Sequence, residues 1–243
     1  PDTFGWQRLA DLGLSRDSVA VAVAGGRVFA VGGLTSARIG GGSSYSKVEE
    51  YRAADDEWVA VAGLPTSLGA AGAVGGPDGK VYVFGGIQYV FNIQSPLFPE
   101  RRDLDTVFVY DPARNAWTRR APMPRPLVSP AVAVARNGRI YVLDGSDNYE
   151  YDPRTDLWAT RRGLPPARTG LGAAGAPDGL VYAAGGFDAD SKALAIVEAY
   201  DPARDTWTRR ADMLSARGGI TLVAGKGSIF AVDGSTMEEG ILP

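Results

Sequence analysis

Four arginines with obvious chemical potential recur along the chain, each just before a run of small residues. They are Arg16, Arg125, Arg168 and Arg217. A planar guanidinium group can bind both oxygens of a carboxylate or phosphate at once. If the fold gathers these side chains, they predict a pocket for an acidic peptide, a small anion or an acidic sugar. The alternative is that the repeat itself needs them, to bond backbone carbonyls or neighbouring acids.

Histidine and cysteine are both absent from the sequence. Histidine is the commonest general base and metal ligand, and cysteine supplies thiolate nucleophiles and disulfides. We therefore expect no metal and no cofactor, and the sequence leans away from an enzyme. The carboxylates left for proton transfer are not paired at any spacing that fixes their geometry. These candidate acids are Glu100, Asp103, Asp188 and Asp190.

Length and composition favour one all-β domain, because 243 residues with 32 glycines and 16 prolines suit a single fold with many turns. A net charge of -3 gives no basic face, so we expect no nucleic-acid partner. No apolar run reaches the roughly 20 residues of a membrane span. We expect a soluble protein, either cytoplasmic or exported with its leader removed.

An internal repeat organises the chain, and a fixed period of this kind defines the fold question. A tyrosine is followed seven positions later by a tryptophan four times, and each pair follows a β-rich run that ends in a glycine doublet. The aromatic pairs are Tyr51 and Trp58, Tyr110 and Trp117, Tyr151 and Trp158, and Tyr200 and Trp207. The doublets are Gly32-Gly33, Gly85-Gly86 and Gly185-Gly186, with Asp144-Gly145 and Asp233-Gly234 as variants.

This order of glycine doublet, tyrosine and tryptophan resembles that of kelch-repeat proteins, and the resemblance covers essentially the whole chain. It implies an all-β fold, a β-propeller of four-stranded antiparallel blades whose innermost strands crowd around an axis. The tryptophans would pack between neighbouring blades and supply much of the adhesion, since each buries a large apolar area. The glycine doublets would form turns.

The repeats predict five blades. Their bounds are residues 16 to about 61, 68 to about 119, 125 to about 162, 168 to about 210, and 217–243 together with 1–9. The last assignment arises because Pro1 to Trp6 repeats the spacing of Pro112 to Trp117, so the chain begins inside a tryptophan unit. Strands from both ends would then share the fifth blade. The alternative is a fragment of a six- or seven-bladed propeller.

One face of such a propeller would carry the connections between second and third strands, and these are the long and variable segments here. Loops on a rigid scaffold are where binding residues usually lie. Besides the arginines, the candidates for ligand or partner contact on this face are Arg38, Tyr89, Phe91, Phe98, Arg101 and Arg102. The alternative for the aromatic residues is that they pack the insertion 87–103 over the central channel.

The function that these observations favour is a non-catalytic module that binds a protein or an acidic ligand. In kelch-type adaptors of ubiquitin ligases, arginines of this region engage acidic peptides, and the resemblance implies the same here. One alternative is a carbohydrate-active enzyme of mutarotase type, which would use carboxylate and arginine side chains. Another is a structural or sensor domain of a larger protein. Fold alone does not decide among them.

Overall fold

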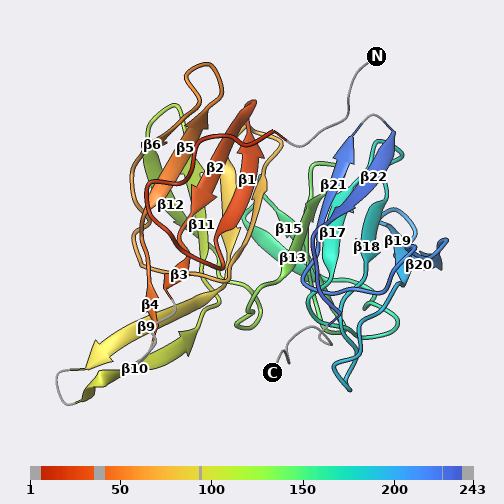
Figure 1. Cartoon of the computed structure of the whole chain (residues 1–243). Helices are drawn as coiled ribbons and strands as arrows, with labels where there is room; N and C mark the ends of the chain where they lie inside the picture. The colour runs from red at the N-terminus through yellow and green to blue at the C-terminus, as the bar shows by residue number, and fades with distance from the viewer. Residues whose placement is uncertain (1–6, 36–41, 93–94, 226, 237–243) are drawn as a thin grey trace.

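Short apolar strands separated by tight turns fold the chain into successive antiparallel sheets (Figure 1). The computed structural model describes residues 7–35, 42–92, 95–225 and 227–236. Within these ranges four sheets have four strands each, joined in simple meanders, and we call them blades 1 to 4 in chain order. The predicted all-β fold of four-stranded antiparallel blades is therefore confirmed. In the same ranges no helix is long and apolar enough to cross a membrane.

The strands of the blades are short, as their turn signals predict. Blade 1 contains β1 (Ala20–Ala24), β2 (Arg27–Val31), β5 (Val48–Arg52) and β6 (Glu57–Ala60). Blade 2 contains β7 (Gly72–Gly75), β8 (Val81–Phe84), β11 (Val107–Asp111) and β12 (Ala116–Arg120). Blade 3 contains β13 (Ala131–Val134), β14 (Ile140–Asp144), β15 (Asp147–Asp152) and β16 (Leu157–Thr160). Blade 4 contains β17 (Gly172–Gly175), β18 (Val181–Ala184), β19 (Val197–Asp201) and β20 (Thr206–Arg209).

Three two-stranded units complete the described structure. The pair β21 (Thr221–Gly225) and β22 (Ser228–Val232) lies where the sequence predicts blade 5. The pair β3 (Leu34–Thr35) and β4 (Ser43–Ser44) lies in the connection from β2 to β5. The pair β9 (Ile87–Asn92) and β10 (Ser95–Asp103) lies in the connection from β8 to β11. Both small pairs thus interrupt the link between the second and third strands of a blade.

The first strands of all five units line one central channel of about 380 Å³. Two residues before each of these strands, the backbone turns through a left-handed residue. These residues are Ser18, Ala70, Ser129, Gly170 and Gly219, with φ between 51° and 66°. The Ala70 N–H donates to the Ser18 carbonyl at 2.9 Å, and Ser129 N–H donates to the Ala70 carbonyl at 2.7 Å. Small side chains are needed here because the strands crowd around the axis.

The hydrophobic core lies between the blades and not inside any one of them. Its clusters join residues of neighbouring sheets, for example Phe29 of blade 1 with Val83 and Tyr110 of blade 2. In blades 2 to 4 the repeat tyrosine meets an aromatic ring on the second strand of the preceding blade. The ring centroids are 5.6 Å apart for Phe29 and Tyr110, 6.2 Å for Tyr82 and Tyr151, and 5.4 Å for Tyr141 and Tyr200.

A repeated hydrogen-bond arrangement, which we call the interblade clasp, joins each of blades 2 to 4 to the blade before it and joins blade 1 to the segment that contains Ala10. The tyrosine hydroxyl donates to an Asp or Asn five residues later, at 2.6–2.8 Å. The same oxygen accepts a backbone N–H from the preceding segment at 2.8–3.0 Å, and the tryptophan Nε1–H donates to the carbonyl of that same residue at 2.7–3.1 Å. The acceptors Asp56, Asn115, Asp156 and Asp205 hold Ala10, Ala62, Ala121 and Arg162, respectively.

The clasp explains both the residue types and their electrostatics. Its four acceptors all have a left-handed backbone, with φ from 49° to 59°, a conformation that Asp and Asn tolerate better than other side chains. The hydrogen bond from Tyr200 and the backbone N–H of Arg162 hold the pKa of Asp205 below its usual range. The tryptophans remain half-buried. Their contribution is therefore a directed hydrogen bond as well as apolar contact.

The number of blades stays a prediction, because residues 1–6 and 237–243, which would complete blade 5, lie outside the described residues. The innermost strands contact one another in the order β1, β7, β13, β17 and β21. Among the described strands, β21 does not pack along β1 in this way (Figure 1). Val21 and Val23 of β1 are 56% and 60% exposed as a result. The equivalent residues of β13, Val132 and Val134, pack against the core of blade 2.

Replacement of a clasp acceptor should destabilise the fold. Asp205→Ala leaves the Tyr200 hydroxyl and the Arg162 N–H without their shared acceptor, so we expect a loss of about 1–3 kcal/mol in the free energy of unfolding, measured by urea denaturation. Asp205→Asn is the matched control, because Asn115 performs the same role in blade 2. Equal losses in the two variants would show that the hydrogen bonds are not the cause.

Candidate functional site

The left-handed residues at the channel give a structural alignment of the recurrent arginines. The position two residues before each of them is occupied by Arg16, Leu68, Leu127, Arg168 and Arg217. Arg125 lies two residues earlier and belongs to a different position, so the predicted set of four equivalent arginines is wrong in blade 3. In blade 3 the equivalent position is occupied by Leu127, and an arginine of the expected type happens to stand two residues before it.

Arg168 lies inside blade 4, and its side chain is fully buried. Its Nη1 donates to Oε2 of Glu198 at 2.7 Å, and its Nε donates to the carbonyl of Gly185 at 2.9 Å. Burial lowers the pKa of Arg168 below that of a free arginine. Arg16 is buried in the same way, with its Nη2 2.8 Å from Oε2 of Glu49. Neither guanidinium group is open to a ligand in this conformation.

The partner of each arginine stands two residues before the repeat tyrosine, and the two positions change together. Where Leu68 replaces arginine in blade 2, Phe108 replaces glutamate, and both belong to one apolar cluster. In blade 3, Leu127 is likewise matched by Tyr149. Each blade therefore fills the same interior space with either an ion pair or an apolar pair. This pattern supports the alternative that the repeat itself needs these arginines, to bond neighbouring acids and backbone carbonyls.

Arg217, in the predicted blade 5, differs because no carboxylate pairs with it among the described residues. Its Nη1 and Nη2 donate to the carbonyls of Asp233 and Ala231, both at 3.1 Å. None of Arg16, Arg168 and Arg217 lines the central channel in the described structure. The expectation that the arginines circle its mouth is corrected accordingly, since they run along the blades from the channel outward.

Arg125 is the accessible arginine of the predicted set, with 45% of its side chain exposed. It binds Asp147 through Nε at 2.6 Å, and its Nη2 lies 3.5 Å from Oδ2 of Asp144. Burial raises the pKa of Asp144 above its usual value, and Arg125 opposes that rise. The two aspartates begin and end the tight turn between β14 and β15. This cluster combines a cation with a carboxyl group that holds its proton more tightly than usual.

The insertion of blade 2, predicted as a loop, is a two-stranded ribbon that projects beyond the blades (Figure 1). Arg101 pairs with Tyr89 and Arg102 with Gln88 across the ribbon. Phe91 is 54% exposed, and about half of each arginine side chain is exposed. The described lining of the channel includes no ribbon residue, so the described aromatic residues Tyr89 and Phe91 do not cover the channel.

The base of the ribbon is tied to blade 1. The Tyr89 N–H donates to the Ser44 hydroxyl at 3.2 Å, and Ser44 donates to Ser67 at 2.9 Å. Arg101 and Arg102 pair with acids of their own strand, Asp103 at 2.8 Å and Glu100 at 3.0 Å. Exposed pairs of this kind contribute little stability, so the arginines are available for exchange with another carboxylate. Arg38 and the side chain of Phe98 lie outside the described residues.

The repeats of this chain are similar to those of known proteins. Two stretches of the chain, residues 70–124 and 168–214, match the family model described as Kelch motif. These matches support a kelch-repeat family for the chain. The resemblance found in the sequence is therefore confirmed, and its blades are those of a kelch propeller.

Several relatives of this kelch chain are known. Beta-scruin of Limulus polyphemus is 29% identical over 145 residues, which is 60% of this chain and 15% of the relative. Kelch-like protein 35 of Homo sapiens is 30% identical over 175 residues, 59% of this chain and 29% of the relative. The matched regions thus span less than a third of either relative. The solved structure of YjhT has a TM-score of 0.78 at 15% identity and covers 98% of this chain, which shows the shared fold.

Two sets of residues in this kelch chain were missed by the sequence reasoning. The clasp acceptors stand five residues after each repeat tyrosine, and the position is Asp or Asn in all four blades. The carboxylates Glu49 and Glu198 stand two residues before the tyrosine, in the two blades that have a buried arginine. Counting from the tyrosine in both directions would have found both sets.

The buried pair of blade 4 can be tested by exchange with the pair of blade 2. Arg168→Leu leaves Glu198 buried and unpaired, so we expect a loss of about 3–5 kcal/mol in the free energy of unfolding. The double variant Arg168→Leu with Glu198→Phe copies Leu68 and Phe108 and should recover most of that loss. The measurement is chemical denaturation of both variants. If the double variant is as unstable as the single one, the two positions are not interchangeable modules.

Proposed function

We propose that this kelch propeller is a non-catalytic binding module whose partner-contacting element is the β9–β10 ribbon. A kelch propeller suits protein binding in general, and this chain has features of its own that supplement the shared scaffold. The observation that carries the proposal is the exposure of an aromatic ring, Phe91, on a ribbon that also displays Arg101 and Arg102. Aromatic residues and arginines are the side chains most enriched at protein interfaces.

The chemistry of the ribbon favours an acidic peptide segment as the partner. Its two arginines are held in position by Asp103 and Glu100, and a partner carboxylate could take the place of either acid at little cost. The ribbon also offers backbone groups along the outer edge of β10, which pairs only with β9 in the described structure and to which an extended peptide can add as a strand. Phe91 would then provide the apolar anchor beside the charged contacts.

The ribbon is presented on a fixed platform, which reduces the entropy lost on binding. Blade 2 is joined to blade 1 by the clasp on Ala62, and blade 3 is joined to blade 2 by the clasp on Ala121. Contact of Tyr89 with Ser44 adds a bond at the base of the ribbon. A partner would therefore meet an element whose root is already ordered.

Selection from a displayed library of random peptides tests this proposal. We expect enriched peptides rich in Asp and Glu, and at least a tenfold weaker Kd for them with Phe91→Ala or with the pair Arg101→Glu and Arg102→Glu. Leu157→Ala is the matched control, because Leu157 is 66% exposed on the outer strand of blade 3. Peptides that bind all variants equally would contradict the proposal, as would a library with no enrichment.

A second candidate is the sugar enzyme of mutarotase type, and one observation favours it. Asp144 is a carboxylate with a raised pKa that lies beside Arg125, a combination found at sites of proton transfer. Arg125 would bind the acid group of a reducing sugar, while Asp144 would exchange a proton with the ring oxygen or the anomeric hydroxyl. Asp147 competes for Arg125 and would have to yield it.

Polarimetry of a panel of freshly dissolved reducing sugar acids separates this function from simple binding. An enzyme should speed the approach to rotational equilibrium, and Asp144→Asn should lower that rate at least about 100-fold. Asp55→Asn is the control, since Asp55 is an exposed acid in the turn between β5 and β6. No acceleration over buffer for any sugar in the panel would exclude the activity for this class of substrate.

A further inference from the structure

A cleft of about 490 Å³ lies between blades 3 and 4, on the face of the molecule opposite the ribbon. It is lined by three tight turns, those between β13 and β14, between β17 and β18, and between β19 and β20. In an antiparallel meander these connections all lie at one end of the strands, whereas the connection from β8 to β11 lies at the other. The volume of the cleft is typical of sites for small molecules.

Arg136 lies at this cleft, in a turn position that is proline in the neighbouring blades. One backbone hydrogen bond closes each of these turns, from the N–H of the residue before this position to a carbonyl four residues later, at 2.7–3.0 Å. The bond aligns Arg136 with Pro77 of blade 2 and Pro177 of blade 4. The arginine is therefore not required by the repeat, in contrast to Arg16 and Arg168.

The apolar wall of the cleft is Leu180, whereas the equivalent residue of blades 2 and 3 is a cation. In blade 2, Nζ of Lys80 lies 3.7 Å from Oδ2 of Asp111. In blade 3, Arg139 pairs with Asp152. Leu180 is half-buried and has no charge to offer the equivalent aspartate of blade 4. This position therefore presents apolar surface to the cleft in place of an ion pair.

A short side chain, Ala203, keeps the cleft open. In blade 3 a methyl group built on Gly138 would lie 3.8 Å from Cγ of Pro77 and 3.9 Å from Nη2 of Arg154. The residues of blade 4 that align with Gly138 and Arg154 are Gly179 and Ala203. A methyl group built on Gly179 would meet no heavy atom beyond its chain neighbours within 4 Å. The turns that come close between blades 2 and 3 therefore stand apart at the next junction.

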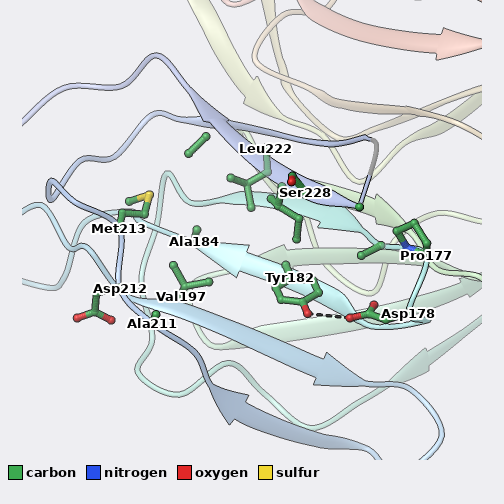
Figure 2. A pocket seen from close by; sticks show the side chains of 14 residues that line it. Pro177, Asp178, Tyr182, Ala184, Val197, Ala211, Asp212, Met213, Leu222 and Ser228 are labelled. Carbon is green, nitrogen blue, oxygen red and sulfur yellow. Dashed lines mark hydrogen bonds between the residues drawn. The ribbon is translucent and has the colours of Figure 1, made fainter.

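The two carboxylates at the rim of the cleft already have donors within their own blade. Each accepts the backbone N–H of the residue two positions later, at 3.0 Å for Asp178 and 2.9 Å for Asp201. Asp178 also accepts the Tyr182 hydroxyl at 2.7 Å (Figure 2). Asp201 also accepts Nη1 of Arg204 at 2.6 Å, and this bond holds the pKa of Asp201 below its usual range. Neither acid therefore needs Arg136 as a partner.

Arg136 is left as the cation available to a ligand. The residue is exposed, and its Nη1 donates to the carbonyl of Pro177 at 3.4 Å, which is long for a hydrogen bond. In the described part of the chain no carboxylate pairs with it. A guanidinium group can bind both oxygens of a carboxylate at once, and such bonds are stronger than one to a neutral carbonyl. A carboxylate ligand would thus replace a weak contact with a charge-assisted pair.

We propose that this cleft binds a small monocarboxylate with an apolar body. Arg136 binds the carboxylate through two of its nitrogen atoms. The apolar part contacts the lining residues that carry no polar side-chain atom, Leu180, Pro202 and Ala203. A dianion such as phosphate fits less well, because the cleft has one cation without an acid partner and Asp178 lies at its rim. The site is separate from the ribbon, so it does not rest on the partner proposed there.

Titration of the whole chain with phenylacetate, followed by amide NMR spectroscopy, tests this site. We expect saturable shifts at the amides of Gly179 and Ala203, with a Kd in the millimolar range that is usual for a ligand of this size. The neutral analogue phenylacetamide should bind at least about tenfold more weakly, because it lacks the charge that Arg136 binds. Arg136→Pro copies blades 2 and 4 and should weaken phenylacetate binding to the same extent.

Arg114→Ala is the matched control, because Arg114 aligns with Arg204 on the same face and its side chain is 78% exposed. It removes one positive charge, as Arg136→Pro does, and should leave the Kd unchanged. Arg136→Gln gives a second measurement if the proline variant misfolds, and it should weaken binding equally. Equal weakening by Arg114→Ala would overturn the proposal, because net charge alone would then explain the binding. So would equal binding of phenylacetamide, tighter binding of inorganic phosphate, or the absence of saturable shifts with phenylacetate.

Discussion

The structure depends on the interblade clasp, in which three side chains of one blade hold the two backbone groups of a single residue in the blade before it. Apolar packing between sheets is favourable but non-directional, and it would tolerate some sliding of one blade over the next. The clasp removes that freedom, because a donor and an acceptor on one peptide segment must be met together. The left-handed backbone of Asp56, Asn115, Asp156 and Asp205 places the acceptor oxygen where both donors reach it.

Inside each blade a second rule applies, and it removes two arginines from consideration as ligand groups. In blades 1 and 4 this interior space is filled by an Arg–Glu ion pair. In blades 2 and 3 it is filled by Leu packed with an aromatic residue. A buried ion pair is not intrinsically more stable than an apolar pair of similar volume, so both solutions can coexist in one molecule. The two positions must change together, because a buried charge without its partner destabilises the fold. Recurrence of a residue type therefore indicates a role in the scaffold, as it does for Arg16 and Arg168.

The sequence was sufficient for the fold because the spacing of glycine doublets, tyrosines and tryptophans has a period that only stacked sheets satisfy. The sequence prediction failed at Arg125, because this residue has the expected type but lies two residues before the equivalent backbone position. That position is set by the left-handed Ser129, whose conformation cannot be read from its identity. Burial of Arg168 was equally out of reach without its partner Glu198, which lies 30 positions away. The ribbon strands were missed because Pro96 and Pro99 argue against regular pairing in their segment.

The place of the ribbon in the ring separates the two surfaces that the protein offers. Blade 2 is clasped on both sides, through Ala62 and Ala121, and therefore does not need blade 5 to keep its orientation. The open side, with the exposed valines of β1 and the free edge of β22, lies at the other end of the series of blades. Because the clasps act between nearest neighbours, each surface can be altered while the other retains its geometry.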